Sequence, residues 1–154
     1  MGQPTYEQVD LMLKLYELRR EPRLREARTW FVDHYSVSSP EEMLKKYPPG
    51  STENTNIRMT ISYWDMVASI VHRGLIDEEM FFENTGEIWL VWDRIRPVVP
   101  AWRAAFKNPT IFANLEQVCK RLEEWREKRA PGSTAAMKQM LEQMARSAAK
   151  ATGE

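Results

Sequence analysis

Hydrophobic residues recur every three or four positions along almost the whole chain, which is the spacing of one face of an α-helix. The clearest case is the stretch 57–75, in which two neighbouring lines of large apolar residues follow one helix. A helix that is apolar over so much of its circumference belongs at the centre of a bundle. Because no stretch alternates polar and apolar residues with a period of two, the pattern predicts an all-α fold.

Proline and glycine divide this helical pattern into segments. A proline lacks the amide donor that a helix interior needs, and glycine adopts the backbone conformation that ends many helices. Helices are also expected to begin at residues with capping side chains or at an early proline. The expected breaks are Glu21-Pro22, Tyr47-Pro48-Pro49-Gly50, Gly74 and Pro131-Gly132, and the expected starts are Ser39-Pro40, Ile57, Asp77, Asn108-Pro109 and Ser133 or Thr134.

The segment 77–106 is rich in large apolar residues but is interrupted by Gly86, Pro97 and Pro100. It is expected to form one bent helix or two. The chain as a whole is therefore expected to be a single-domain bundle of about six helices over residues 1–130. An amphipathic helix with a frayed tail is expected to follow over residues 131–154.

Length and charge narrow the classes of protein to consider. A chain of 154 residues suits one compact domain, and its 22 basic residues balance its 22 acidic ones, so no overall field attracts nucleic acid or acidic lipid. Stretches without charge or histidine, such as 108–115, are at most eight residues long, far shorter than the ~20 residues of a membrane-spanning helix. The single Cys119 allows no internal disulfide, and the amino terminus lacks a secretory signal. A cytoplasmic location is expected.

Two groups of titratable residues are candidates for a metal-binding or enzymatic bundle with a pocket between helices. Asp65 and His72 lie two helical turns apart among apolar residues, and the alternative is a histidine hydrogen-bonded near the turn. Glu79, Glu83 and Glu87 share one face if a helix continues through Gly86, and such a row holds a divalent cation or is a solvated acidic face. No phosphate loop or nucleophile elbow is present, so no catalytic residue and no cofactor are predicted.

The segment 94–129 contains nine basic residues and four glutamates, interleaved with aromatic residues. This mixture is typical of proteins that bind single-stranded nucleic acid by phosphate contact and stacking. These aromatic residues also have the spacing of a helical core, so they are explained as buried rings flanked by arginine stems, and nucleic acid is not the expected partner. The candidate contacts for nucleic acid are Arg94, Arg96, Arg103 and Lys107.

The last helix is the most suggestive feature for a protein partner. It follows a Pro-Gly break and carries a narrow apolar line, which is typical of a helix that docks in a groove or against a copy of itself. The alternative is that it folds back onto its own core. We expect a non-catalytic interaction or regulatory module that binds a protein partner or forms a homodimer. The expected contact residues are Met137, Met140, Leu141 and Met144.

Several short stretches between residues 10 and 126 are similar to one protein family. They are Leu15-Tyr16-Glu17-Leu18-Arg19-Arg20, Arg28-Thr29-Trp30-Phe31, Trp64, His72-Arg73-Gly74-Leu75-Ile76-Asp77-Glu78-Glu79, Trp89, Arg96-Pro97 and Phe112-Ala113-Asn114-Leu115-Glu116. The chain thereby resembles an uncharacterised family of bacterial all-helical proteins, known as the domain of unknown function DUF4760. Members of this family often resemble proteins that are tethered to a membrane by an amino-terminal membrane-spanning segment. No such segment is expected from this sequence. The resemblance implies a helical fold and transfers no activity, ligand or functional residue.

Overall fold

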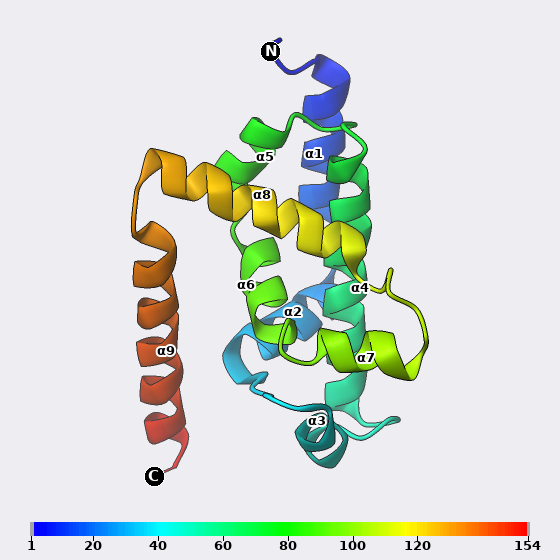
Figure 1. The fold of residues 1–154 in the computed structure, drawn as a ribbon, viewed down its shortest axis with the longest axis vertical. Helices are drawn as coiled ribbons and strands as arrows, with labels where there is room; N and C mark the ends of the chain where they lie inside the picture. Colours follow the sequence, from blue (N-terminus) through cyan, green and yellow to red (C-terminus); the bar gives the residue numbers. More distant parts are fainter. Residues whose placement is uncertain (1, 154) are drawn as a thin grey trace. The chain divides into compact units, whose positions relative to one another are not determined.

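The computed structural model describes residues 2–153, and within them the chain forms α-helices and no strand (Figure 1). The all-α class is confirmed, whereas the expected number of about six helices is wrong. Nine helices are present among the described residues. They are α1 (Tyr6–Leu18), α2 (Pro22–His34), α3 (Pro40–Lys46), α4 (Thr52–His72), α5 (Glu78–Asn84), α6 (Glu87–Ile95), α7 (Val99–Ala105), α8 (Ala113–Arg129) and α9 (Ser133–Thr152).

The central segment accounts for most of the difference in helix number. It forms the three short helices α5, α6 and α7 instead of one bent helix or two. Helix α5 ends before Gly86, which precedes the first residue of α6. Helix α6 ends at Ile95, and Arg96 still has helical backbone angles, but Pro97 has no amide hydrogen with which to continue the helical hydrogen bonds. Pro100 instead fits the first turn of α7, where its missing amide hydrogen would have no helical partner.

Local capping signals place several helix starts correctly. Ser39 accepts a hydrogen bond from the Glu42 amide at 3.2 Å at the start of α3, and Asp77 accepts one from the Met80 amide at 2.8 Å at the start of α5. Helix α4 begins earlier than expected, at Thr52, because the Ser51 hydroxyl caps its amino terminus. The capping residues therefore determine these boundaries more closely than the apolar pattern does.

The starts of the last two helices differ from expectation. Asn108 does not open α8, because its side-chain oxygen accepts hydrogen bonds from the amide and the hydroxyl of Thr110 at 3.0 and 2.6 Å. That local turn delays the helix to Ala113. Ser133 and Thr134 do not cap α9. Gly132 takes the cap position with φ of 84°, a conformation that favours glycine.

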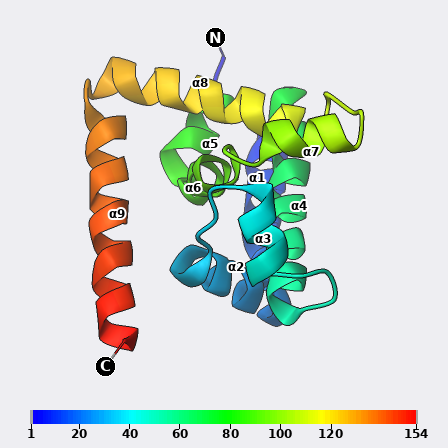
Figure 2. The same cartoon turned by 60° about the horizontal axis from the view of Figure 1, so that its bottom comes forward.

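The described residues divide into two compact units, one that ends at Cys119 and one that begins at Lys120. The expected division at residue 130 stays a prediction. Helix α4 is central to the first unit, where it packs on α2 and α6, as its broad apolar face predicts. Figures 1 and 2 both show α3 close to the amino-terminal half of α4. None of the described helices has the length and hydropathy to cross a membrane.

The core of the first unit is made of large aromatic and aliphatic side chains. Burial of each such side chain contributes about 1.5–3 kcal/mol relative to its exposure to water. Cys119 is also fully buried, as expected for a lone cysteine that packs as a small hydrophobe. The fully buried large residues include Phe31, Ile57, Trp64, Trp89, Ile95 and Leu115.

Candidate functional site

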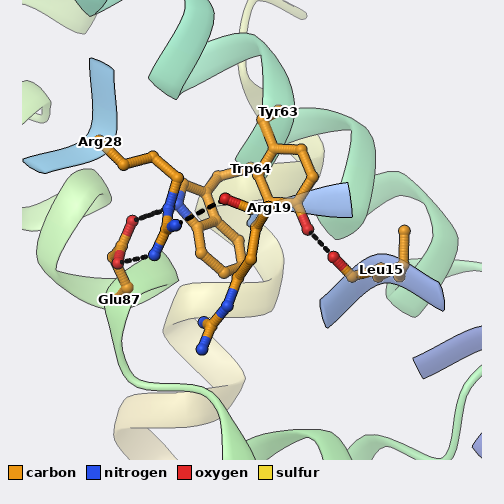
Figure 3. A network of polar contacts seen from close by, with 6 residues as sticks. All are labelled: Leu15, Arg19, Arg28, Tyr63, Trp64 and Glu87. Atoms are coloured by element: carbon orange, nitrogen blue, oxygen red, sulfur yellow. Dashed lines mark hydrogen bonds and ion pairs between the residues drawn. The ribbon is translucent and has the colours of Figure 1, made fainter. Parts of the chain in front are cut away.

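A bidentate ion pair lies in the interior of the first unit (Figure 3). Arg28 of α2 donates from Nε and Nη2 to the two carboxylate oxygens of Glu87 at 2.7 and 2.6 Å, and both side chains are largely buried. The indole nitrogen of Trp64 donates to the same carboxylate at 3.1 Å. Glu87 is the first residue of α6, so the positive end of the helix dipole further stabilises its charge. The pair joins three helices and leaves little net charge.

The same cluster fastens the carboxyl end of α1. Arg28 donates from Nη1 to the Arg19 carbonyl at 2.8 Å, and the Tyr63 hydroxyl donates to the Leu15 carbonyl. The last carbonyls of a helix need such partners from outside it. Burial raises the pKa of Tyr63 to about 12, so this hydroxyl keeps its proton at neutral pH. Arg28 and Tyr63 therefore hold α1 against the rest of the first unit.

An apolar pocket of about 330 Å³ lies beside this cluster, between α1, α4 and α5. Trp64, Val67 and Phe81 are buried and form its floor. Leu13 and Tyr16 are 56% and 50% exposed and form its rim. The volume falls within the range of roughly 300–1,000 Å³ that is typical of small-molecule sites. The remaining lining residues are Met12, Leu15, Arg19, Tyr63, Asn84 and Thr85.

Arg19 is the one charged residue among the described residues that line this pocket. Its guanidinium carbon lies 4.3 Å from the centre of the Tyr16 ring, in a cation–π contact. In Figure 3 no hydrogen bond or ion pair is drawn from this guanidinium, whereas the Arg28 guanidinium is bonded to Glu87. The pocket therefore combines apolar walls with one cation that no carboxylate of its lining neutralises.

The predicted Asp65 and His72 differ in burial, and their pairing stays a prediction. His72 is exposed at the end of α4, and Asp65 is half-buried. Burial raises the pKa of Asp65, and a hydrogen bond from the amide of Leu115, in the first turn of α8, partly opposes that rise. One oxygen of the Asp65 carboxylate is buried without a hydrogen-bond partner among the described residues. Neither residue lines the apolar pocket. Asp65 thus acts as a cap that one helix supplies to another.

The predicted acidic row lacks the continuous helix that it requires. Helix α5 carries Glu79 and Glu83 and ends at Asn84, and Glu87 belongs to α6, where Arg28 binds it. Among the residues that the structure describes, no group of three or more histidine, cysteine, aspartate or glutamate side chains is placed to hold a metal ion.

Three of the four basic candidates for nucleic acid bind groups of their own chain. Arg94 donates to two carbonyls in the last turn of α2, and burial lowers its pKa. Arg103 donates to the Ile111 carbonyl at 2.9 Å and to a carboxylate of α8 at 2.7 Å. Arg96 pairs with the aspartate three residues before it at 3.1 Å. Lys107 is exposed on the turn after α7.

The predicted partner-binding line lies on α9, in the second unit. Met140 and Met144 are 59% and 60% exposed, Met137 is exposed and Leu141 is half-buried. Their spacing of three and four residues places all four on one side of the helix. The charged residues recur every four positions on the opposite side, and they are Lys138, Glu142, Arg146 and Lys150.

The amino terminus of α9 is held by a residue that the sequence pattern does not single out. The carboxylate of Glu127, near the end of α8, accepts hydrogen bonds from the amides of Gly132 and Thr134 at 2.9 and 3.1 Å. These bonds satisfy two amides of the first turn, which have no partner within the helix. They also lower the pKa of Glu127.

Comparison with known families gives one match. A family model described as a domain of unknown function, DUF4760, matches residues 4–122. The chain belongs to the DUF4760 family. The resemblance to this family that the sequence indicated is thereby confirmed. The ion-pair cluster and the apolar pocket both lie within the residues that match DUF4760, whereas α9 lies beyond them. No curated protein and no solved structure matches the chain.

Sequence reasoning missed the ion-pair cluster and the pocket of this DUF4760 domain. Arg28 and Glu87 are 59 residues apart, and no local spacing relates them. A weak signal was present, because Glu87 directly follows the helix-breaking Gly86 and so stands at a helix start. Arg19 had no such signal, since its place at the pocket depends on how α1 packs against α4 and α5.

Proposed function

We propose that this DUF4760 protein is a non-catalytic helical interaction module that associates with a second copy of itself through α9. One observation carries the proposal: Met140 and Met144 are more than half exposed on one face of a 20-residue helix. Apolar surface in water is unfavourable by roughly 25 cal/mol for each Å², so burial of this face against a partner favours association.

The distribution of side chains around α9 supports association between copies. The four charged residues lie opposite the methionine line, so contact along that line buries no charge. Small residues, Ala145 and Ala148 among them, flank or continue the line and permit two helices to approach closely. Methionine side chains are flexible and polarisable and adapt readily to an apolar partner surface.

Several charged side chains bind other groups of the same chain, which supports a role without catalysis. Arg28 and Glu87 neutralise each other, Asp65 caps α8, and Arg94 binds the end of α2. Each of these groups has a function in holding helices together. A metal-binding or enzymatic bundle stays an alternative, and a thermal shift in the presence of divalent metal ions tests it.

The proposed setting is the cytoplasm of a bacterium. The bacterial source is suggested by the resemblance alone. The buried Cys119 needs no oxidising compartment. Fractionation of cells that express the protein tests the location, and recovery with the membrane fraction after a salt wash contradicts it.

Measurement of mass in solution by light scattering tests self-association. The double variant Met140→Glu/Met144→Glu places two charges on the proposed contact, and it is expected to convert a dimer to a monomer. Gln139→Glu/Gln143→Glu adds the same charge on other faces of α9 and is the matched control, with the mass unchanged. Circular dichroism checks that helix content is retained in both. Equal masses for wild type and the methionine variant contradict the proposal.

A further inference from the structure

The pocket between α1, α4 and α5 has the composition of a site for an apolar ligand. Its floor contains Trp64 and Phe81, which are almost completely buried, and its rim contains the exposed Leu13 and Tyr16. A polar ligand such as a sugar or a nucleotide would bury hydrogen-bonding groups against the Trp64 and Phe81 rings of the floor, which offer them no partner, at a cost of roughly 1–3 kcal/mol for each group. An apolar molecule gains by the same burial.

Three polar side chains of the lining, Tyr63, Trp64 and Asn84, are already bonded within the protein, and the Asn84 amide donates to the Met80 carbonyl. The Tyr63 hydroxyl donates to the Leu15 carbonyl, and the Trp64 indole donates to Glu87. The charge of Glu87 is balanced by Arg28. These groups therefore present no unsatisfied charge to a ligand.

Arg19 differs from these groups. Its guanidinium contacts the face of Tyr16, and among the described lining residues no acidic side chain balances it. Its positive charge also acts on Tyr63, another lining residue, because it partly offsets the rise in the pKa of Tyr63 that burial causes. A guanidinium at the edge of an apolar pocket favours a carboxylate, which it binds through charge-assisted hydrogen bonds.

We propose that this pocket binds a small apolar molecule with a single carboxylate, such as a medium-chain fatty acid, with its carboxylate on Arg19 and its chain over Trp64 and Phe81. The site lies in the DUF4760 domain and not on α9, so it goes beyond the proposed self-association.

Titration calorimetry with sodium decanoate, below its micelle concentration, tests the site on the full chain. One molecule is expected to bind per chain, and 1-decanol, which has the same chain without the charge, is expected to bind more weakly. Arg19→Gln is expected to weaken decanoate binding about tenfold, which corresponds to about 1.4 kcal/mol. Arg20→Gln makes the same change in charge one position along, outside the pocket lining, and is expected to leave affinity within twofold.

A second pair of variants tests the apolar rim. Leu13 and Leu18 lie on the same helix and are similarly exposed, but only Leu13 lines the pocket. Leu13→Ser is expected to weaken decanoate binding several-fold, and Leu18→Ser to leave it unchanged. Equal effects of Arg19→Gln and Arg20→Gln, or of the two leucine variants, overturn the proposal.

The methionine line of α9 is a competing apolar surface, and its variant separates the two proposals. Met140→Glu/Met144→Glu is expected to bind decanoate as the wild type does. Loss of binding in that variant, or binding of several molecules per chain, overturns the pocket site without bearing on self-association. An unchanged mass of that variant with retained decanoate binding overturns self-association alone.

Discussion

Arg28 and Glu87, which are 59 residues apart in the chain, meet through two nearly parallel hydrogen bonds of 2.7 and 2.6 Å. The planar guanidinium matches the carboxylate in a geometry that a lysine cannot reproduce. The remaining contacts of the pair reach the Trp64 indole and the Arg19 carbonyl. One ion pair therefore determines how α1, α2, α4 and α6 are held relative to one another.

Glu87→Gln is expected to lower the free energy of unfolding by about 2–3 kcal/mol, because it leaves the guanidinium of Arg28 largely buried without a counter-charge. Urea denaturation measures the loss. Glu26→Gln is the control, because the Glu26 carboxylate lies 3.9 Å from Arg23 in an exposed ion pair. Loss of this exposed pair is expected to lower the free energy of unfolding by less than about 0.5 kcal/mol. Similar losses in the two variants contradict a structural role for the buried pair.

Thr60 on α4 is completely buried, and its hydroxyl has no hydrogen-bond partner among the described residues. Valine has almost the same shape without the polar atom, so Thr60→Val is expected to raise the free energy of unfolding by about 1 kcal/mol. Thr55→Val is the control, because the exposed Thr55 hydroxyl donates to the Ser51 carbonyl at 3.2 Å and its replacement is expected to bring no gain. A loss of stability in Thr60→Val refutes this prediction.

Asp65 is expected to make stability fall as pH rises. Burial raises the pKa of Asp65 above its ordinary value of 3.8, so the unfolded chain loses this proton at lower pH than the folded chain does. The destabilisation begins near pH 3.8 and is complete above the raised pKa. Asp65→Asn retains an oxygen that accepts from the Leu115 amide and removes the titration.

The test is the difference in unfolding free energy between wild type and Asp65→Asn, measured in steps from pH 3 to pH 7. Titrations of other groups are common to both proteins and cancel in that difference. The variant is expected to gain on the wild type as pH rises. A wild type that gains on the variant over this range shows that the Leu115 hydrogen bond outweighs desolvation.

Helix boundaries were predictable where the determining contact is local. The side chains of Ser39 and Asp77 reach amides three residues ahead, and a proline acts on its immediate neighbours. The pattern failed where a distant group takes part. Asp65 caps a helix that begins about 50 residues later in the chain, and no spacing in the sequence encodes that approach.

The candidate sites divide in the same way. The methionine line of α9 is a property of one helix, so its periodicity alone reveals it. The apolar pocket needs side chains from three helices, and the role of Arg19 follows only from their packing. The acidic row required one helix that continues through Gly86. Instead Gly86 precedes the first residue of the new helix α6, and Glu87 forms an ion pair with Arg28.

Glu127→Ala is expected to loosen the first turn of α9. The Glu127 carboxylate accepts from the amides of Gly132 and Thr134, and these bonds lower its pKa below the ordinary value of 4.5. The cap is therefore fully present above pH 4.5 and is lost as pH falls through the lowered pKa. Amide hydrogen exchange at Gly132 and Thr134 is expected to be faster in the variant at neutral pH. Glu124→Ala is the control, because it removes an exposed glutamate of the same helix, and it is expected to leave those exchange rates unchanged. Equal acceleration in both variants shows that negative charge on α8, and not the cap, protects this turn.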